Sequence, residues 1–298
     1  MLKGSKLTRQ FQKAGYDVLY TSIMESDWEE AFTEPVDRIV VAGGDGTISR
    51  VAQWLAGRKT PFCILPLGTA NNCARSLGQM NTVESIISGL RSEQIKQVDV
   101  GVVVSSAGQS TFVESVGIGF LAEAMSSMRA LEKKKNSRIR LTPDERLDQA
   151  LKHLRRMAKN YRQIECELLL DDQTVVGRLL LLEIANMAFI GPNLQLLPGP
   201  DPSDGWFDVV WMEGEQQNEW RKCLKLCGKG EPVTAPANFR RCKRISIRYL
   251  DAPVHVDGKV YLTMATPISI RLECGALRLI DLRSYDGSFR HKSVIDGT

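Results

Sequence analysis

The sequence lacks any long apolar run. No stretch approaches the roughly 18 to 20 uninterrupted apolar residues that a helix needs to cross a bilayer. The opening residues, MLKGSKLTRQFQKAG, also lack the apolar core of a secretory signal peptide. We therefore expect neither a membrane-spanning helix nor export, and we expect the chain in the cytoplasm.

Cysteine provides no covalent or metal-binding framework. The seven cysteines are an odd number, and no CxxC spacing recurs along the chain. This pattern argues against a disulfide scaffold and against a zinc site of the usual spacing. Cys223 and Cys227 lie one helical turn apart, where the packed face of a helix accounts for both. Reduced, buried thiols are expected.

Two common nucleotide-binding signatures are also missing. The chain has no GxxxxGK[ST] motif, and no GxGxxG follows a strand with a later acidic partner. The 39 Lys and Arg against 35 Asp and Glu leave a formal charge of +4, which does not by itself predict nucleic-acid binding. A hydrophobic content of 43% and a length of 298 residues indicate a folded protein, with two domains as the natural expectation.

The first hundred residues alternate between strand-like and helix-like segments. Residues 2–14 predict a helix, residues 16–20 a short strand, and residues 37–42 a buried strand. A helical stripe follows at i, i+3, i+4 and i+7, formed by Ile48, Val51, Ala52 and Leu55. The same order recurs in PFCILPL, GTANN and CARSLG. Two adjacent strand–turn–helix units predict a parallel sheet with its turns at one edge.

After about Asp99 strand candidates dominate. They span residues 100–104, 111–116, 163–170, 175–184, 206–212, 244–250 and 268–272. Hairpin signals between them favour an antiparallel, β-rich second domain. Two helices are expected to interrupt it, one opened by a capping box from Thr142 to Glu145 and the other beginning near Asn218.

The segment IVVAGGDGTISRVAQWL carries the clearest chemistry. A strand leads into Gly43, Gly44, Asp45, Gly46 and Thr47, and a helix begins there. Glycines let backbone N–H groups approach an anion, and a helix N-terminus adds partial positive charge, so the turn suits a polyphosphate. A merely tight connection would need about one glycine, not three. A carboxylate beside phosphates calls for a bridging metal ion, so Mg-nucleotide is the expected ligand.

Together with PLGTANNCARSLG about twenty residues later, GGDGT resembles the diacylglycerol kinase catalytic-domain family, which is related to sphingosine and ceramide kinases. The resemblance implies that Gly68, Thr69, Asn71 and Asn72 join the first turn in binding ATP. Asn71 and Asn72 are also suited to cap the following helix, which is compatible with phosphate binding.

The resemblance extends over nearly the whole chain. The segments QVDVGVV and FVESVGIGFLAEAM are similar to the family's passage into its second domain. LLPGPDPSDGWFDVVWM resembles the segment in which backbone carbonyls and an aspartate hold a structural magnesium, here Asp204 and its neighbours Ser203 and Trp206. Asp204 also suits an ordinary turn. VHVDGK matches the turn that carries the general base, here Asp257, with Asp45 as its catalytic partner at the phosphates. His255 is left out of the catalytic set, because a lone strand histidine is usually structural.

The implied fold is a nucleotide-binding α/β domain of the NAD kinase and diacylglycerol kinase type plus a β-sandwich, with the active site between them. We expect the α/β domain over residues 1–101, rejoined by residues 283–298, and the β-rich lipid-binding domain over residues 102–282. The family opens with a strand and an Asn-Pro-Xaa-Xaa-Gly turn, whereas this chain begins at MLKGSKL, so the first strand is expected to be missing. Lys259 also stands where the family has Glu.

Basic residues gather in three places, at residues 133–140, along the helix bearing Lys152, Arg155, Arg156 and Lys159, and at residues 240–244. A solvated surface is the ordinary explanation, but a lipid kinase must also meet an anionic bilayer, so peripheral membrane contact is expected. Nucleic acid is not expected as a partner, because no aromatic residues are interleaved with these runs. The sequence leaves open whether the protein forms a homodimer.

Three functions remain. The leading one is an ATP-dependent kinase that uses magnesium and phosphorylates a lipid hydroxyl such as that of diacylglycerol. The second is a catalytically weak lipid- or nucleotide-binding relative, motivated by the missing first motif and by Lys259. The third is an NAD kinase, motivated by GGDGT alone; it expects an Asn-Glu pair where this chain has Asn71 and Asn72.

Overall fold

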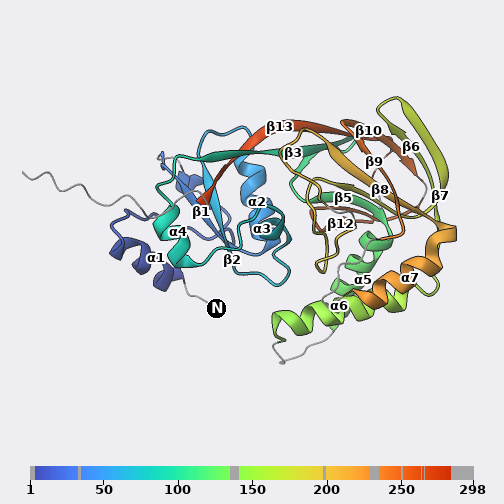
Figure 1. The fold of residues 1–298 in the computed structure, drawn as a ribbon, viewed down its shortest axis with the longest axis horizontal. Coiled ribbons are helices and arrows are strands. Elements are labelled where there is room, and N and C mark those ends of the chain that lie inside the picture. The colour runs from blue at the N-terminus through green and yellow to red at the C-terminus, as the bar shows by residue number, and fades with distance from the viewer. Residues whose placement is uncertain are drawn as a thin grey trace, which may run out of the picture.

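The computed structural model describes residues 4–32, 35–134, 141–196, 199–227, 235–249, 251–262, 264 and 266–282. These residues form two units that lie side by side along the long axis of the molecule (Figure 1). The N-terminal unit mixes helices with parallel strands, and the C-terminal unit is built mainly from antiparallel strands with three helices on one side.

The N-terminal unit contains the two predicted strand–turn–helix repeats. Its elements are α1 (Gly4–Lys13), η1 (Glu30–Phe32), β1 (Ile39–Gly43), α2 (Asp45–Leu55), β2 (Phe62–Pro66), α3 (Asn72–Ser76) and α4 (Val83–Gly89). Strands β1 and β2 are parallel, with Ile39 opposite Phe62. The predicted stripe of α2 is buried against them. Both repeats therefore bring their turns to the same edge of the sheet.

Two long strands join the units. Strands β3 (Ile95–Ser105) and β13 (Ile268–Ile280) pair antiparallel along almost their full lengths and run across the top of Figure 1. The far end of β13 pairs with β2 in parallel through Leu279 and Phe62. Strand β13 thus brings the chain back to the N-terminal unit, whereas residues 283–298, expected to do so, lie outside the described residues.

The C-terminal unit encloses its main core between strands. These strands are β4 (Gly108–Phe112), β5 (Ser115–Gly119), β6 (Ile164–Leu170), β7 (Gln173–Ala185), β8 (Phe207–Glu213), β9 (Asn238–Cys242), β10 (Arg244–Tyr249), β11 (Val254–Val256) and β12 (Lys259–Tyr261). Neighbouring strands of the sheet are hydrogen-bonded in the order β1-β2-β13-β10-β6-β7-β5-β11-β12, which includes β1 and β2 of the N-terminal unit. Buried side chains such as Phe112, Leu168 and Ile247 fill the space between the strands.

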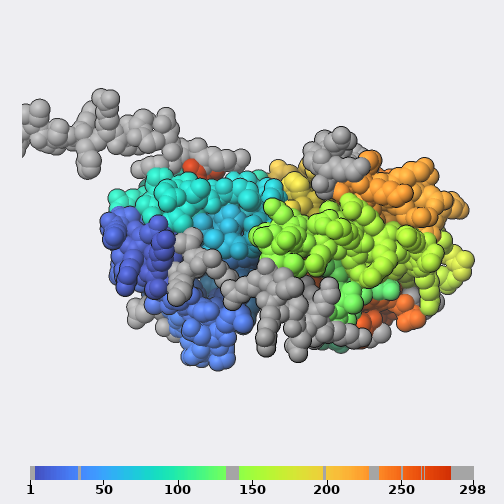
Figure 2. Space-filling view, turned by 90° about the horizontal axis from the view of Figure 1, so that it is seen from below, coloured from blue at the N-terminus to red at the C-terminus, as the bar shows by residue number. Residues whose placement is uncertain are grey.

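Three helices cover one side of this unit. They are α5 (Phe120–Lys134), α6 (Pro143–Met157) and α7 (Gln217–Leu226). Figure 2 shows the yellow-green α6 and the orange α7 together on one face, with α6 next to the N-terminal unit in this view. Helix α6 begins with the predicted capping box, in which Thr142 and Glu145 bond each other's backbone N–H groups. Phe120 of α5 and Trp220 of α7 pack edge to face.

Some sequence expectations differ from the fold. Residues 16–20 do not form a strand, although Tyr16 and Val18 pack against the core beside β2. A strand-like sequence does not by itself form a strand, because a strand requires hydrogen-bonded pairing with a neighbour. Helix α5 was not predicted, because its sequence follows directly on the glycine-containing strand β5. Residues 111–116, expected as one strand, are divided between β4 and β5.

Candidate active site

The two glycine-containing turns meet backbone to backbone. A Cβ atom on Gly68 would lie 2.4 Å from the Cα of Gly44, and one on Gly44 would lie 2.9 Å from the Cα of Gly68. The N–H of Leu67 donates to the carbonyl of Gly43 at 2.9 Å. Glycine is required for this close approach. The motifs GGDGT and PLGTANN, separate in the sequence, therefore form one continuous surface.

Asp45 links the two turns. It is the first residue of α2, with Gly44 as N-cap, and its Oδ1 accepts the N–H of Cys73 in α3 at 3.0 Å. Burial raises the pKa of Asp45, while backbone hydrogen bonds, that of Cys73 first, lower it. The carboxylate thus stands at the N-terminus of α2, where free N–H groups and the helix dipole favour anions.

The other predicted binding residues line or brace the same surface. Gly46 is exposed, and Thr47 and Thr69 are half-buried. Asn71 has a left-handed backbone with φ of 54° and is the N-cap of α3 without a side-chain capping bond. Its Oδ1 instead accepts the N–H of Gly68 at 2.9 Å. Asn71 therefore holds the shape of the second turn.

Glu114, between β4 and β5, completes the site and was missed by sequence reasoning. Asn72, which is 2% exposed, donates from Nδ2 to Glu114 Oε1 at 3.2 Å and to the carbonyl of Gly191 at 2.8 Å. Glu114 itself is buried. The available signal was a charged residue inside the otherwise strand-like segment FVESV, because buried charges are rare without a role.

Three side chains converge beside the turns. The potential ligand atoms of Asp45, Cys73 and Glu114 lie within 4.8 Å of one another. Burial, followed by the charges of Asp45 and Asp257, raises the pKa of Glu114 well above its usual value. Burial and the nearby carboxylates also raise the pKa of the Cys73 thiol. The two carboxylates fit a magnesium ion, which prefers oxygen ligands, whereas a protonated thiol does not.

Asp257 is tied into the fold by an unusual number of donors. It occupies a left-handed position with φ of 46° in the turn between β11 and β12. Its carboxylate accepts from Ser49 Oγ at 2.5 Å, Gln53 Nε2 at 3.5 Å, and the N–H groups of Val113 at 2.8 Å, Glu114 at 2.8 Å and Ser115 at 3.2 Å. A carboxylate offers about four lone-pair sites, so these donors fill it.

The hydrogen bonds of Asp257 connect the two units. Burial raises the pKa of Asp257, while the Ser49 hydroxyl and then the backbone N–H groups lower it. Ser49 belongs to α2 of the N-terminal unit. The carboxylate therefore anchors α2 to the strands of the C-terminal unit, and a role as proton acceptor stays a prediction.

His255 and Lys259, each two residues from Asp257, contact other side chains. Lys259 is exposed, and its Nζ lies 5.1 Å from the centroid of the Tyr261 ring. His255 is buried and its Nε2 contacts Glu183 Oε1 at 2.9 Å. Gly117 lies between His255 and Glu183 in the sheet and leaves room for both side chains. His255 is thus a buried structural residue, in line with its omission from the catalytic set.

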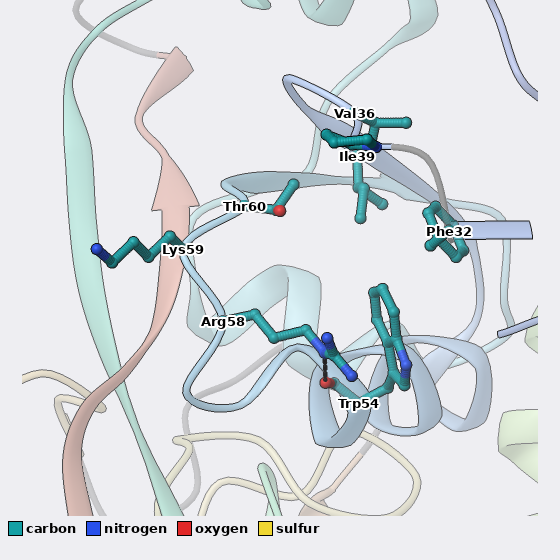
Figure 3. Close-up of a pocket in the computed structure, with 8 residues that line it drawn as sticks. Phe32, Val36, Ile39, Trp54, Arg58, Lys59 and Thr60 are labelled. Carbon is teal, nitrogen blue, oxygen red and sulfur yellow. Dashed lines mark hydrogen bonds between the residues drawn. The ribbon is translucent and has the colours of Figure 1, made fainter. Parts of the chain in front are cut away.

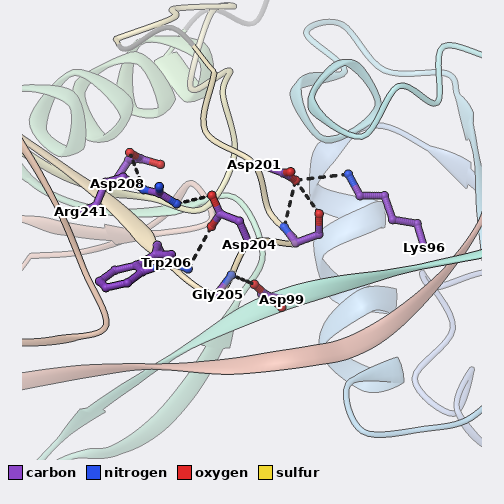
Figure 4. Close-up of polar contacts among 9 residues, drawn as sticks. Lys96, Asp99, Asp201, Asp204, Gly205, Trp206, Asp208 and Arg241 are labelled. Atoms are coloured by element: carbon purple, nitrogen blue, oxygen red, sulfur yellow. Dashed lines mark hydrogen bonds and ion pairs between the residues drawn. The ribbon is translucent and has the colours of Figure 1, made fainter.

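The loop before β8 contains the predicted structural magnesium ligands (Figure 4). Asp99 on β3, which is buried, accepts the N–H of Gly205 at 2.8 Å and that of Gly275 at 2.7 Å. Lys96, also on β3, pairs with Asp201 at 3.3 Å. The loop is therefore fixed to the strands that join the two units.

The side chains of this loop make contacts within the chain. Asp204 Oδ2 pairs with the guanidinium of Arg241, and its Oδ1 accepts the N–H of Trp206 at 3.1 Å. Ser203 donates from Oγ to Asp201 at 2.6 Å. A cation of the chain already neutralises Asp204, and both carboxylate oxygens are engaged. The side chains of Ser203 and Asp204 are thus directed to partners within the chain. The structural magnesium site, which the resemblance assigns to backbone carbonyls and an aspartate, stays a prediction.

A separate hollow lies at the other edge of the N-terminal sheet (Figure 3). Its volume is about 330 Å³, and it is lined by Phe32, Pro35, Val36, Ile39, Trp54, Arg58, Lys59 and Thr60. Ile39 begins β1, whereas the GGDGT turn follows its end. None of these lining residues is a predicted site residue, so the hollow is distinct from the candidate active site.

Comparisons with known proteins agree with the geometry of the turns. Residues 3–103 match the diacylglycerol kinase catalytic domain, and residues 124–281 match the YegS C-terminal NAD kinase beta sandwich-like domain. The chain belongs to the diacylglycerol kinase catalytic-domain family. The predicted family and fold class are therefore confirmed, and membership of this kinase family supports a phosphotransferase activity.

Curated relatives of the family cover most of the chain. A diacylglycerol kinase of Mycobacterium tuberculosis is 24% identical over 246 residues, which are 80% of this chain and 75% of the relative. A diacylglycerol kinase of Bacillus subtilis is 25% identical over 241 residues, covering 77% and 74%. At this identity the family is shared, and the acceptor of the phosphate is a separate question.

Solved structures show the same fold. A diacylglycerol kinase from Bacillus anthracis has a TM-score of 0.57 at 19% identity, covering 94% of this chain and 82% of that one. An NAD kinase from Archaeoglobus fulgidus in complex with ATP has a TM-score of 0.52 at 12% identity, covering 95% and 92%. Among the helices of the described residues, none is both long and apolar enough to cross a membrane.

Proposed function

We propose that this protein transfers the γ-phosphate of ATP to the hydroxyl of a lipid such as diacylglycerol. The observation that carries the proposal is the single surface formed by the GGDGT and PLGTANN turns, with Asp45 and Glu114 beside it. The names of the curated relatives support a lipid acceptor. The ATP bound by the Archaeoglobus fulgidus NAD kinase supports ATP as donor.

The turns would hold the triphosphate through the backbone. Gly44, Gly46 and Gly68 carry no side chain, so an anion can approach their N–H groups, and the N-terminus of α2 adds favourable charge. Asp45 and Glu114 would hold a magnesium ion together with the phosphates. The ion would neutralise charge that develops on the transferred phosphoryl group. Asn71 keeps the second turn in the required shape.

The proton of the lipid hydroxyl must leave as the hydroxyl attacks. Asp257 stays our predicted acceptor, because it lies in contact with both units and belongs to the motif that carries the base in the family. Its five donors require that one of them yields when the carboxylate takes a proton.

Contact with an anionic membrane is proposed for the basic surface of the C-terminal unit. Residues 135–140 lie outside the described residues, so that part of the predicted surface is not placed. On α6, Lys152 pairs with Asp148, and Arg155 donates to the carbonyls of Leu224 and Cys227. Of the other two predicted basic residues, Arg156 contacts His153 Nδ1 at 2.8 Å, and Lys159 follows the end of the helix. They are expected to contribute about 1 kcal/mol each near anionic lipid.

The test is a transfer assay with radiolabelled ATP and a panel of acceptors. The panel contains diacylglycerol, other lipid alcohols and NAD, and the variant Asp45→Asn serves as the site control. We expect label in a lipid product and a loss of roughly 10² or more in the variant, because Asp45 acts through the metal on the phosphates. Label in NAD alone would favour the NAD kinase alternative. A folded protein that labels no acceptor would contradict the proposal.

A further inference from the structure

A basic pocket lies on the C-terminal unit, apart from the candidate active site. Its volume is about 470 Å³, and its lining residues are Asp171, Gly205, Trp206, Lys243, Arg244, Arg271, Leu272 and Cys274. They come from the hairpin between β6 and β7, the loop before β8, the turn between β9 and β10, and the strands β10 and β13. None of them belongs to the GGDGT and PLGTANN turns or to the cluster of Asp45, Cys73 and Glu114.

Two arginines are placed against each other in this pocket. Arg244 on β10 and Arg271 on β13 are directly opposite in the antiparallel pairing of their strands, so their side chains leave the same face of the sheet. Like charges at directly opposite positions destabilise a sheet. Glu273 pairs with Arg271 at 2.5 Å, but among the described residues Arg244 forms no ion pair. An anion between the strands would relieve this repulsion.

The acidic residue of the pocket organises the cations without pairing with them. Asp171 accepts the backbone N–H of Lys243 at 3.2 Å and that of Arg244 at 3.0 Å. It thereby fixes the start of β10 and presents two adjacent basic side chains. Both of these side chains are exposed, and Lys243, like Arg244, has no ion-pair partner in the described part of the chain.

Trp206 forms an aromatic wall beside these cations. Lys243 Nζ lies 4.5 Å from the centroid of the Trp206 ring, and the guanidinium of Arg241 lies 5.6 Å from it. Arg241 is held by Asp204 and Asp208 (Figure 4), so the loop that carries the indole has a defined position. Cation–π attraction therefore orients the Lys243 ammonium before any ligand arrives.

We propose that this pocket binds a phosphate group, either on a lipid headgroup or free in solution. Arg244 and Arg271 offer planar donor forks that match phosphate oxygens, and Lys243 adds a compact positive charge. A phosphate monoester carries more charge than a carboxylate and fits a volume of this size. The site is additional to the proposed nucleotide site, so its occupancy does not depend on kinase activity.

The test measures binding by the full chain without ATP. Inorganic phosphate is titrated by calorimetry, and vesicles of phosphatidylcholine with or without phosphatidic acid are tested by sedimentation. The variant Lys243→Gln, Arg244→Gln removes the two unpaired cations. Arg248→Gln is the matched control, because Arg248 is exposed on the same strand but is already paired with Glu167. Phosphate bound at the Gly44 turn would be unaffected by either change.

We expect the double variant to bind phosphatidic acid vesicles about thirtyfold less tightly than the parent, from two lost cations. The Arg248→Gln variant should bind like the parent. Loss confined to vesicles assigns the site to a lipid headgroup, and loss with inorganic phosphate as well assigns it to phosphate from either source. Equal binding by parent and double variant in both assays would overturn the proposal, as would a parent that binds neither. Thermal unfolding confirms that each variant is folded, and Arg244→Gln alone replaces the double variant if it is not.

Discussion

The GGDGT and PLGTANN turns and the loop before β8 are all glycine-containing segments, but their sequences determine them in different ways. In the turns, Gly44 and Gly68 create the contact by lacking side chains, and Asp45 lies within the same motif. In the loop, the Asp204 carboxylate forms an ion pair with Arg241, which is distant in the sequence. A motif therefore predicts backbone shape more securely than it predicts the ligand of a side chain.

Asp257 lies between these two cases. Its turn was predicted from VHVDGK, and the structure places the residue in contact with both units. Its hydrogen-bond donors come from α2 and from the segment around Glu114, which no local pattern could reveal. Substitution of Asp257 can distinguish the two cases, because a structural anchor and a proton acceptor respond differently to the same change.

The largest effect is expected for Asp257→Asn. Removing the base should lower turnover with a lipid acceptor by ~10² to 10⁴, with the KM for ATP nearly unchanged. Ser49→Ala is the matched control, because it removes one donor and leaves the carboxylate in place. It should lower the free energy of unfolding by about 1 kcal/mol and change turnover little. Steady-state kinetics and chemical unfolding of both variants provide the measurements.

Two outcomes would contradict the base assignment. If Asp257→Asn turns over lipid as fast as the parent, the proton leaves by another route. If Ser49→Ala loses as much turnover as Asp257→Asn, the carboxylate acts by holding α2 in place. In either case Asp257 would resemble Asp204 in the loop before β8, whose carboxylate contacts a residue on a neighbouring strand.

The fold was predictable where its cause is local. The capping box at Thr142 predicted the start of α6, and the apolar stripe of α2 predicted its buried face. Residues 16–20 show the limit, since pairing with another strand decides whether such a segment joins a sheet. In the site, Asp45 was found from its motif. Glu114 was not found, because its burial depends on α3, on the loop at Gly191 and on Asp257, which are remote in sequence.

A smaller effect is expected at the contact between the turns. Gly68→Ala places a methyl group against the backbone of Gly44, so the free energy of unfolding should fall by about 1 to 3 kcal/mol. Gly46→Ala is the matched control, because no atom lies within 4 Å of its added Cβ and the residue is in a helix. It should be neutral or more stable by less than about 1 kcal/mol. Urea unfolding distinguishes the two, and equal stabilities would show that the turns are not in contact.

The smallest effect concerns the loop before β8. Arg241→Gln should lower the free energy of unfolding by only about 0.2 to 1 kcal/mol, because the pair with Asp204 is partly exposed and screened by water. Arg240→Gln is the control on the same strand, since Arg240 makes a longer contact of 3.7 Å with Asp172.

Whether the loop needs magnesium is best measured in the Asp45→Asn background, which weakens the other proposed magnesium site. There, EDTA should leave the unfolding midpoint unchanged, because Arg241 and Lys96 supply the positive charge that holds the loop. A midpoint that falls with EDTA and returns with magnesium would show that the loop binds the ion after all, and the distinction between the loop and the turns would then disappear.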